Sequence, residues 1–173
     1  QRAQRKPNTP CIDIGQDQLL HTPFLAMAAR QPNAPAVITP HLTLSYKELK
    51  IRARQLAYIL VEASVDVAEC IAVIANKSWV QVVAVLGILE AGAAYLPIDP
   101  SAPKMRRDTL IGKSGCRFAL VQRELFESLD LPIGVSSWPI SDAPVDESKA
   151  LEPLPIRAKI TDLAYVIFTS GST

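Results

Sequence analysis

Two apolar runs, separated by a segment long enough for two helices, constrain the fold of this chain most strongly. "CIAVIAN" (residues 70–76) is a continuous apolar run of strand length, and "RFALVQ" (residues 117–122) is a second strand-like segment around four apolar residues. Such runs are typical of strands in a parallel sheet that is covered on both faces. A helix can begin after Ser78 and end at Gly92, and a second helix can run from Pro103 to near Gly115. This alternation predicts an α/β fold, a mostly parallel sheet with helices on both faces.

The segment before the first apolar run contains a clear helix start. Ser45 and Glu48 have the S-x-x-E spacing of a capping box, in which both side chains satisfy backbone groups of the first turn. We therefore expect a helix from Ser45 to about Ala63. Its expected inward residues are Leu49, Ala53, Leu56 and Leu60, and its expected outward residues are Lys47, Lys50 and Arg54.

The remaining elements are marked by shorter patterns. Residues 20–31 indicate a short helix, and strand-like pieces follow at 35–39 and 42–45. "AYLPIDPSAP" (94–103) is interpreted as an extended crossing stiffened by proline, and residues 139–158, with four prolines and mixed charges, as a surface excursion. "DLAYVIF" (162–168) is then expected to return to the sheet as a strand.

The charge balance and the cysteines exclude several classes of protein. The net charge is +1, from 18 basic and 17 acidic residues, which argues against nucleic acid and anionic membranes as partners. The three cysteines, Cys11, Cys70 and Cys116, are odd in number and far apart, which fits neither a disulfide framework nor the spacing of metal ligands. We expect a reducing cytoplasmic environment, with Cys70 and Cys116 as small core residues. The apolar stretch 78–98 is interrupted by charged and proline residues, which favours a buried helix over a membrane span.

The end of the sequence combines glycine with hydroxyl side chains. After "DLAYVIF" come Thr169, Ser170, Gly171, Ser172 and Thr173. Glycine lets backbone amides converge on an oxyanion, and hydroxyl groups add donors without bulk. By itself the pattern also suits an inert turn or a polar tail. Elsewhere, His21 and His41 have no metal-type neighbours in sequence, and Asp99 is expected to stabilise a local turn.

Three separated stretches of the sequence, read together, help to interpret the hydroxyl-rich residues 169–173. "LSYKEL" (44–49), "LEAGAAYLPIDP" (89–100) and "LAYVIFTSGST" (163–173) occur in this order. Together they resemble the first three core motifs of the adenylation domains of non-ribosomal peptide synthetases, which are members of the AMP-forming acyl-activating superfamily. Glu90 stands where the family usually has lysine, and "SVDVAEC" replaces a glycine-rich turn before the strand in the 70s.

The resemblance implies a fold, a reaction and a set of partners. The chain would be the N-terminal portion of the large lobe of an AMP-forming ligase, with residues 1–18 as an interdomain linker and 19–173 as the first part of the domain, truncated inside the phosphate loop. Such domains join an amino acid to ATP in the presence of Mg²⁺, release pyrophosphate, and load the aminoacyl group on the phosphopantetheine thiol of a peptidyl carrier domain. An upstream condensation or heterocyclisation domain is implied as well.

The resemblance also assigns roles to residues. By matched position, the ATP-binding residues would be Thr169, Ser170, Gly171, Ser172 and Thr173. No catalytic residue or metal ligand is implied within the chain, so we expect the fragment alone to be inactive. Two alternatives remain at this point, namely a free-standing acyl-CoA or aryl-acid ligase of the same superfamily and a non-catalytic scaffold fragment.

Overall fold

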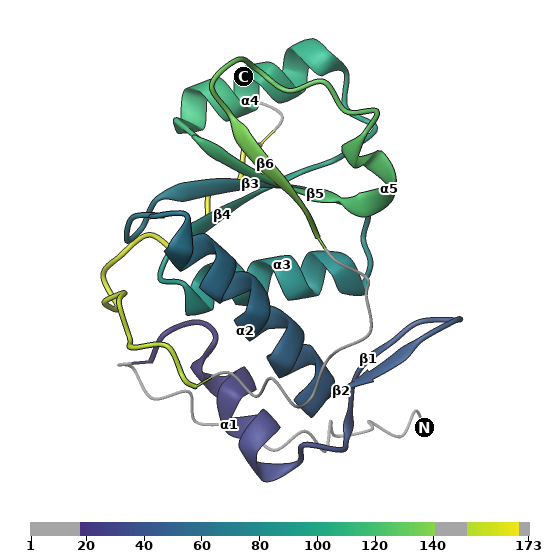
Figure 1. Cartoon of the computed structure of the whole chain (residues 1–173), viewed down its shortest axis with the longest axis vertical. Coiled ribbons are helices and arrows are strands. Elements are labelled where there is room, and N and C mark those ends of the chain that lie inside the picture. Colours follow the sequence, from purple (N-terminus) through teal and green to yellow (C-terminus); the bar gives the residue numbers. More distant parts are fainter. Residues whose placement is uncertain (1–17, 141–151, 170–173) are drawn as a thin grey trace, which may run out of the picture.

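The computed structural model describes residues 18–140 and 152–169, and it contains a four-stranded parallel sheet. The strand order is β4-β3-β5-β6, and each neighbouring pair is parallel (Figure 1). The four strands are β3 (Cys70–Ile74), β4 (Ala94–Ile98), β5 (Phe118–Gln122) and β6 (Ser136–Ile140). The predicted mostly parallel sheet is confirmed.

Helices cover both faces of this sheet, also as predicted. On one face, α2 (Tyr46–Glu62) and α3 (Trp79–Glu90) pack against the side chains of Ile71, Val73 and Leu120. On the other face, α4 (Lys104–Ser114) and the short α5 (Arg123–Phe126) pack against Ala72, Leu96, Ala119 and Val121 (Figure 1). The alternation of residues between the two faces is what a doubly covered strand requires.

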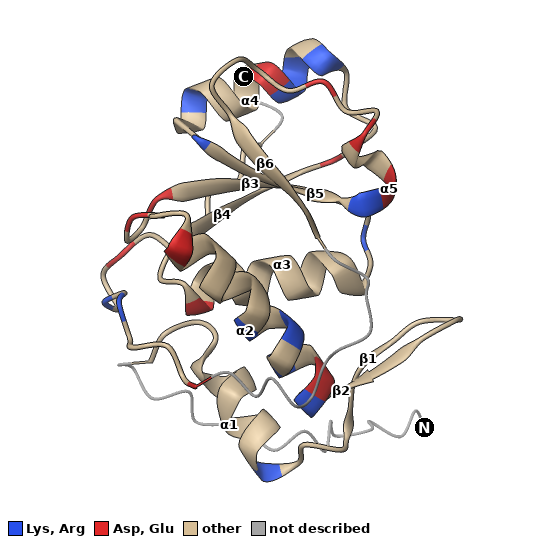
Figure 2. Ribbon diagram, viewed as in Figure 1, with Lys and Arg blue, Asp and Glu red and all other residues tan. Residues whose placement is uncertain are grey.

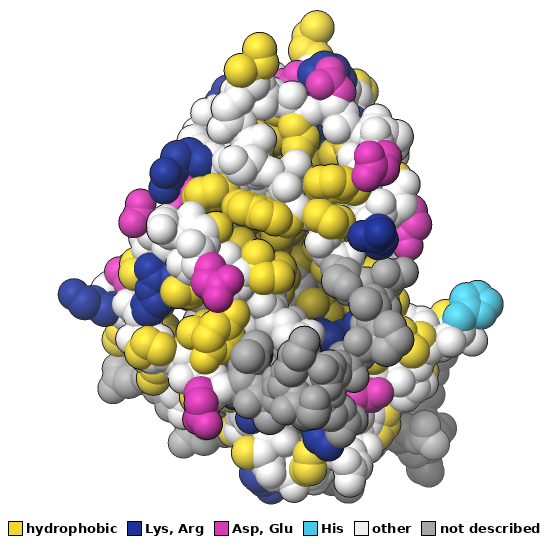
Figure 3. Space-filling model, viewed as in Figure 1, with side chains coloured by type: hydrophobic (Ala, Val, Ile, Leu, Met, Phe, Trp, Pro, Cys, Tyr) yellow, Lys and Arg dark blue, Asp and Glu magenta, His cyan; other side chains and the backbone are white. Residues whose placement is uncertain are grey.

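A smaller unit precedes the sheet. It consists of α1 (Thr22–Arg30) and an antiparallel hairpin of β1 (Pro35–Ile38) and β2 (Thr43–Ser45). His41 lies exposed in the hairpin turn, and a histidine side chain protrudes there in Figure 3. β2 leads directly into α2 at Ser45, whose Oγ accepts the N–H of Glu48 at 3.2 Å while its own N–H donates to Glu48 Oε2 at 2.8 Å. The predicted capping box is therefore confirmed.

α3 is the most apolar helix of the fold. Figure 2 shows it without charged residues except at its C-terminal end, where Glu90 lies. It packs closely on α2, because Gly87 has no side chain and its backbone can therefore approach Ala53 O and Leu56 of α2. No helix among the described residues has the length and apolarity needed to cross a membrane. Over the rest of the described ribbon, basic and acidic residues are interspersed (Figure 2).

Arg54 corrects one prediction about α2. It was expected on the outward face, but it is only 9% exposed, and its Nε donates to Glu90 Oε1 of α3 at 2.7 Å. Burial of both side chains is tolerated because each charge lies next to its counter-charge. The sequence-based assignment failed because the partner lies 36 residues further along the chain.

Residues 94–98 correct a second prediction. They form strand β4 rather than a connecting crossing, with Cys70 to Ile74 of β3 paired in register with Ala94 to Ile98. Pro97 cannot donate a backbone hydrogen bond, and a proline within a strand-like sequence argues against a strand, so the strand was not predicted. β4 is the edge of the four-stranded sheet, where a missing donor is tolerated. β6 was likewise missed, and its last two residues are the first two of the predicted excursion 139–158. Most of that excursion lies outside the described residues.

The segment 162–168 differs from the predicted strand. It runs alongside β4 but shares only one parallel bridge with it, between Tyr95 and Tyr165. Leu163, Tyr165 and Ile167 are exposed, whereas Val166 and Phe168 pack against the apolar cluster on the α4 face. The alternation of exposed and buried residues expected of a strand is present, but the backbone pairing with β4 is limited to a single bridge.

Residues preceding this segment are held to the end of α3. Arg157 Nη1 donates to Ala91 O, at the end of α3, at 3.1 Å, and Nη2 donates to Val65 O, in the loop after α2, at 2.9 Å, so the guanidinium joins these two segments. Gly92 has φ +81°, and a Cβ there would lie 2.9 Å from Arg157 Cβ. Glycine at position 92 therefore serves both the backbone conformation and the close approach of Arg157.

Candidate functional site

The carboxyl ends of the parallel strands form one edge of the sheet. β3, β4 and β5 end at Ile74, Ile98 and Gln122. In open α/β sheets this edge is where ligands bind. The segment after residue 162 reaches the same edge, because Tyr95 N–H donates to Ala164 O at 3.1 Å and Val166 N–H donates to Tyr95 O at 2.9 Å.

Thr169 continues from this pairing to the sheet edge. It lies as far beyond Tyr165 as Asp99 lies beyond Tyr95, and these two tyrosines are paired in parallel. Thr169 is exposed, in keeping with a contact to a ligand. The other four predicted ATP-binding residues, Ser170, Gly171, Ser172 and Thr173, lie outside the described residues. Their role therefore remains a prediction.

Asp99 occupies a tight turn directly after β4. Its Oδ1 accepts the backbone N–H of Ser101 at 2.8 Å and the Ser101 hydroxyl at 2.7 Å. These hydrogen bonds, the one from the hydroxyl first, lower the pKa of Asp99 below its ordinary value, and the charge of Lys77 contributes in the same direction. Asp99 is thus ionised at neutral pH, and the predicted turn role is confirmed.

A cavity of about 290 Å³ lies between the ends of β3 and β4. Its polar lining residues are Asn76, Lys77, Gln81 and Asp99, and Pro97, Ile98 and Pro100 contribute apolar surface. The loop after β3 is fixed by the Asn76 N–H, which donates to Gln122 Oε1 of β5 at 2.9 Å. The cavity offers an ammonium group, a carboxylate and amides, which suit a polar, charged ligand.

Lys77 was missed by the sequence analysis. No motif contains it, and a lysine in a loop is more often a solvated surface residue than part of a site. The signal that could have identified it is its position directly after the strand-like run 70–76, because the carboxyl end of a strand in a parallel sheet lies at the ligand-binding edge. Its proximity to Asp99, however, follows only from the pairing of β3 with β4.

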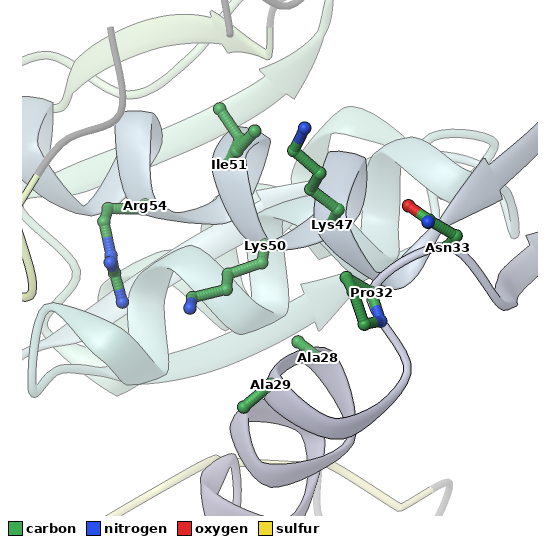
Figure 4. Close-up of a pocket in the computed structure, with 8 residues that line it drawn as sticks. All are labelled: Ala28, Ala29, Pro32, Asn33, Lys47, Lys50, Ile51 and Arg54. Carbon is green, nitrogen blue, oxygen red and sulfur yellow. The ribbon is translucent and has the colours of Figure 1, made fainter.

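A second cavity, of about 470 Å³, lies between α1 and α2 and away from the sheet edge. Figure 4 shows Lys50 and Arg54 projecting from α2 toward α1, which carries Ala28 and Ala29, whereas Lys47 points away from that helix. Its described lining residues include no carboxylate and no histidine, and none of them follows a strand of the parallel sheet. We therefore assign the functional site to the sheet edge.

No group of three or more His, Cys, Asp or Glu side chains that could hold a metal ion occurs in residues 18–140 and 152–169. His21 and His41 accordingly do not take part in a described metal cluster. His21 is the N-cap residue of α1 and makes no side-chain cap bond there. Burial lowers its pKa, so the neutral imidazole is favoured in the folded state.

Comparison with protein families gives a match over most of the chain. Residues 24–173 match the family described as AMP-binding enzyme. Phenyloxazoline synthase MbtB of Mycolicibacterium paratuberculosis is 40% identical over 173 residues, which are 100% of this chain and 14% of that protein. Gramicidin S synthase 2 of Brevibacillus brevis is 33% identical over 169 residues, covering 96% of this chain and 4% of that protein.

Solved structures give the same result. The α-methyl-L-serine-AMP-bound form of the nonribosomal peptide synthetase FmoA3 matches with a TM-score of 0.82 and 37% identity, covering 89% of this chain and 17% of that one. Its AMPPNP-bound form matches with a TM-score of 0.81 and 36% identity, over 90% and 17% of the two chains. The present chain thus spans less than one fifth of each of these proteins.

Proposed function

Because this chain belongs to the AMP-binding enzyme family, we propose that it is the N-terminal part of an adenylation domain of a non-ribosomal peptide synthetase. The observation that carries the proposal is the family match over residues 24–173. The proposed domain boundaries are those of the sequence analysis, with residues 1–18 as a linker and 19–173 as part of the domain. A cytoplasmic location belongs to the same proposal, because ATP and free amino acids are available there.

The proposed reaction has two steps. A carboxylate oxygen of the amino acid attacks the α-phosphate of ATP, and the bond to the β-phosphate breaks, giving an aminoacyl-adenylate and pyrophosphate. A phosphopantetheine thiol on a downstream carrier domain then attacks the acyl carbon, and AMP leaves. An upstream condensation or heterocyclisation domain would use the loaded amino acid.

Within this chain, the proposed role is to hold the leaving pyrophosphate. Thr169 to Thr173 would donate backbone and hydroxyl hydrogen bonds to the β- and γ-phosphate oxygens, on which negative charge builds in the transition state. The exposure of Thr169 and the alignment of its segment with β4 support this role. Mg²⁺ enters the proposal as the counter-ion of the ATP phosphates, and we assign it no ligand in this chain.

The test is amino-acid-dependent exchange of pyrophosphate into ATP, measured on the intact protein that contains this chain. A panel of amino acids, aryl acids and fatty acids is assayed with and without coenzyme A. We expect exchange with one amino acid or a few similar ones, independent of coenzyme A. Acyl-CoA formation from an aryl or fatty acid would instead identify a free-standing ligase, and no exchange with any acid would refute the proposal.

A further inference from the structure

Two buried thiols lie in contact near the amino ends of neighbouring strands. Cys70 is the first residue of β3, Cys116 lies two residues before β5, and β3 and β5 are hydrogen-bonded parallel neighbours (Figure 1). The two side chains are hydrogen-bonded to each other. Both belong to the apolar cluster on the α4 face, where they are 8% and 6% exposed, and both are free cysteines.

Two separate local structures fix the positions of these thiols. Cys70 is held in β3 by its pairing with Ala94 of β4. Cys116 directly follows the left-handed Gly115 (φ +64°) at the end of α4, and its N–H donates back to Ile111 O at 3.2 Å. This arrangement is a Schellman-type helix end. Neither backbone has to be ordered further when the sulfur atoms react, so little conformational entropy remains to be lost.

We propose that Cys70 and Cys116 form an oxidisable dithiol that closes to a disulfide, joining the end of α4 to the start of β3, when the protein meets a peroxide. One of the two sulfur atoms attacks one oxygen of hydrogen peroxide, which gives a sulfenic acid and one water. The other sulfur then attacks the sulfenic sulfur, the S–S bond forms, and the hydroxyl leaves as a second water with the proton of the second thiol. The two thiols lose two electrons and two protons, and the peroxide takes up both.

The two thiols differ in their electrostatic environment. The hydrogen bond with Cys116 lowers the pKa of Cys70, whereas the same bond, together with burial and the negative charge nearby, raises the pKa of Cys116. The thiolate of either cysteine is the attacking nucleophile, and the other sulfur resolves the sulfenic acid.

The pair is also close to solvent. The residues adjacent in sequence, Glu69 and Arg117, form an ion pair (Nε–Oε1 2.7 Å) in which the Arg117 side chain is 58% exposed. A small peroxide thus needs to pass only the Glu69–Arg117 pair at the amino ends of the strands. A bulky thiol reagent is excluded, because the cysteines are only 8% and 6% exposed.

The test uses the full chain with Cys11→Ser, so that Cys70 and Cys116 are the only thiols left. The folded protein is treated with hydrogen peroxide, quenched, and analysed by intact mass and by peptide mapping without reductant. We expect the mass to fall by two hydrogen atoms, both thiols to disappear together, a Cys70–Cys116 cross-linked peptide to form, and dithiothreitol to reverse the change. The oxidised form should also melt higher than the reduced one, by about 5 °C or more.

Two control variants carry either Cys70→Ser or Cys116→Ser in addition to Cys11→Ser. Each variant retains one thiol and should show neither the loss of two hydrogen atoms nor the peroxide-dependent rise in Tm. The mass measurement on the two-cysteine chain does not depend on whether these variants fold. Gain of oxygen atoms on separate cysteines, cross-links between chains, or thiols that stay reduced in peroxide would each overturn the proposal.

Discussion

Arg54 of α2 donates its Nε hydrogen to Oε1 of Glu90 of α3 at 2.7 Å, with side-chain exposures of 11% and 7%. This ion pair joins the two helices that cover one face of the sheet. It also accounts for Glu90, which stands where the resembling adenylation domains usually carry lysine, because a lysine at position 90 would face the Arg54 guanidinium.

The first prediction concerns this pair. Glu90→Ala leaves Arg54 buried without the counter-charge and should lower the free energy of unfolding by about 3–5 kcal/mol. Glu90→Lys should cost at least as much. The double variant Arg54→Met/Glu90→Leu should recover most of the loss, since an apolar pair needs no desolvation of charge. Urea denaturation measures all three.

The exposed pair Lys104–Asp108, 2.8 Å apart with side-chain exposures of 49% and 32%, is the matched control. Lys104→Ala should leave the unfolding free energy almost unchanged, because water screens an exposed pair. Equal losses from the buried and the exposed pair would contradict the role assigned to burial.

The second prediction compares two helical glycines. A Cβ at Gly87 would lie 2.8 Å from Ala53 O and 3.0 Å from Leu56 Cβ, so Gly87→Ala should force α2 and α3 apart and cost about 1–3 kcal/mol. A Cβ at Gly112 of α4 would meet nothing within 4 Å, so Gly112→Ala should stabilise the protein by about 0.5–1 kcal/mol through helix propensity. Thermal denaturation of both variants checks the opposite signs. A stabilised Gly87→Ala protein would show that the helices are not in close contact.

The third prediction compares two N-cap serines. The Ser45 hydroxyl accepts the Glu48 N–H in the capping box of α2, so Ser45→Ala should cost about 1 kcal/mol. Ser78 makes no side-chain cap bond, and its Oγ is buried without a partner among the described residues. Ser78→Ala should therefore be neutral or slightly stabilising, because it removes a buried polar atom that lacks a hydrogen bond. Chemical denaturation curves of the two variants should diverge, and equal losses would argue against this assignment of caps.

The fourth prediction concerns pH. Burial lowers the pKa of His21 below 6.5, so the unfolded chain binds its proton at a higher pH than the folded chain does. Stability due to neutral His21 is fully present above pH 6.5 and falls as the pH drops through 6.5 toward the folded-state pKa. The slope can reach about 1.4 kcal/mol per pH unit for one proton. The carboxylates of Glu48 and Asp99, whose pKa values are lowered, titrate below this range.

Unfolding free energies measured from pH 7.5 to pH 5 test the role of His21. His21→Gln should flatten the slope over this range, because the glutamine side chain does not bind a proton there. His41→Gln, in the exposed hairpin turn, serves as the control and should leave the slope as in the parent. An unchanged slope in His21→Gln would assign the pH dependence to another group.

The fifth prediction concerns the hydroxyl loop. Thr169→Ala and Ser170→Ala in the intact protein should lower the rate of ATP–pyrophosphate exchange by about tenfold or more, since each removes a hydroxyl donor proposed to contact the phosphates. Thr161→Ala changes another exposed threonine, eight residues before Thr169 and outside the loop, and should leave the rate unchanged. Full exchange activity in both loop variants would remove these hydroxyls from the proposed site.

Part of the site could be predicted from the sequence, because its chemistry resides in consecutive residues. Thr169 and the glycine and hydroxyl residues after it form one short stretch, and the apolar run before it indicated a sheet-edge position. Lys77 and Asp99 could not be predicted as neighbours. They lie on different connections and meet only because β3 and β4 are paired in register.

The sequence by itself determined the elements whose stabilising contacts are local. The capping box at Ser45, the helix end near Gly115 and the strand in the apolar run 70–76 each depend on residues within a few positions of one another, and each was predicted correctly. Only the tertiary structure decided that residues 94–98 form a strand despite Pro97, that Arg54 is buried against Glu90, and that two distant cysteines touch. These contacts join residues 24 to 46 positions apart, and at such separations the packing of the sheet and its helices, not local preference, selects the partner.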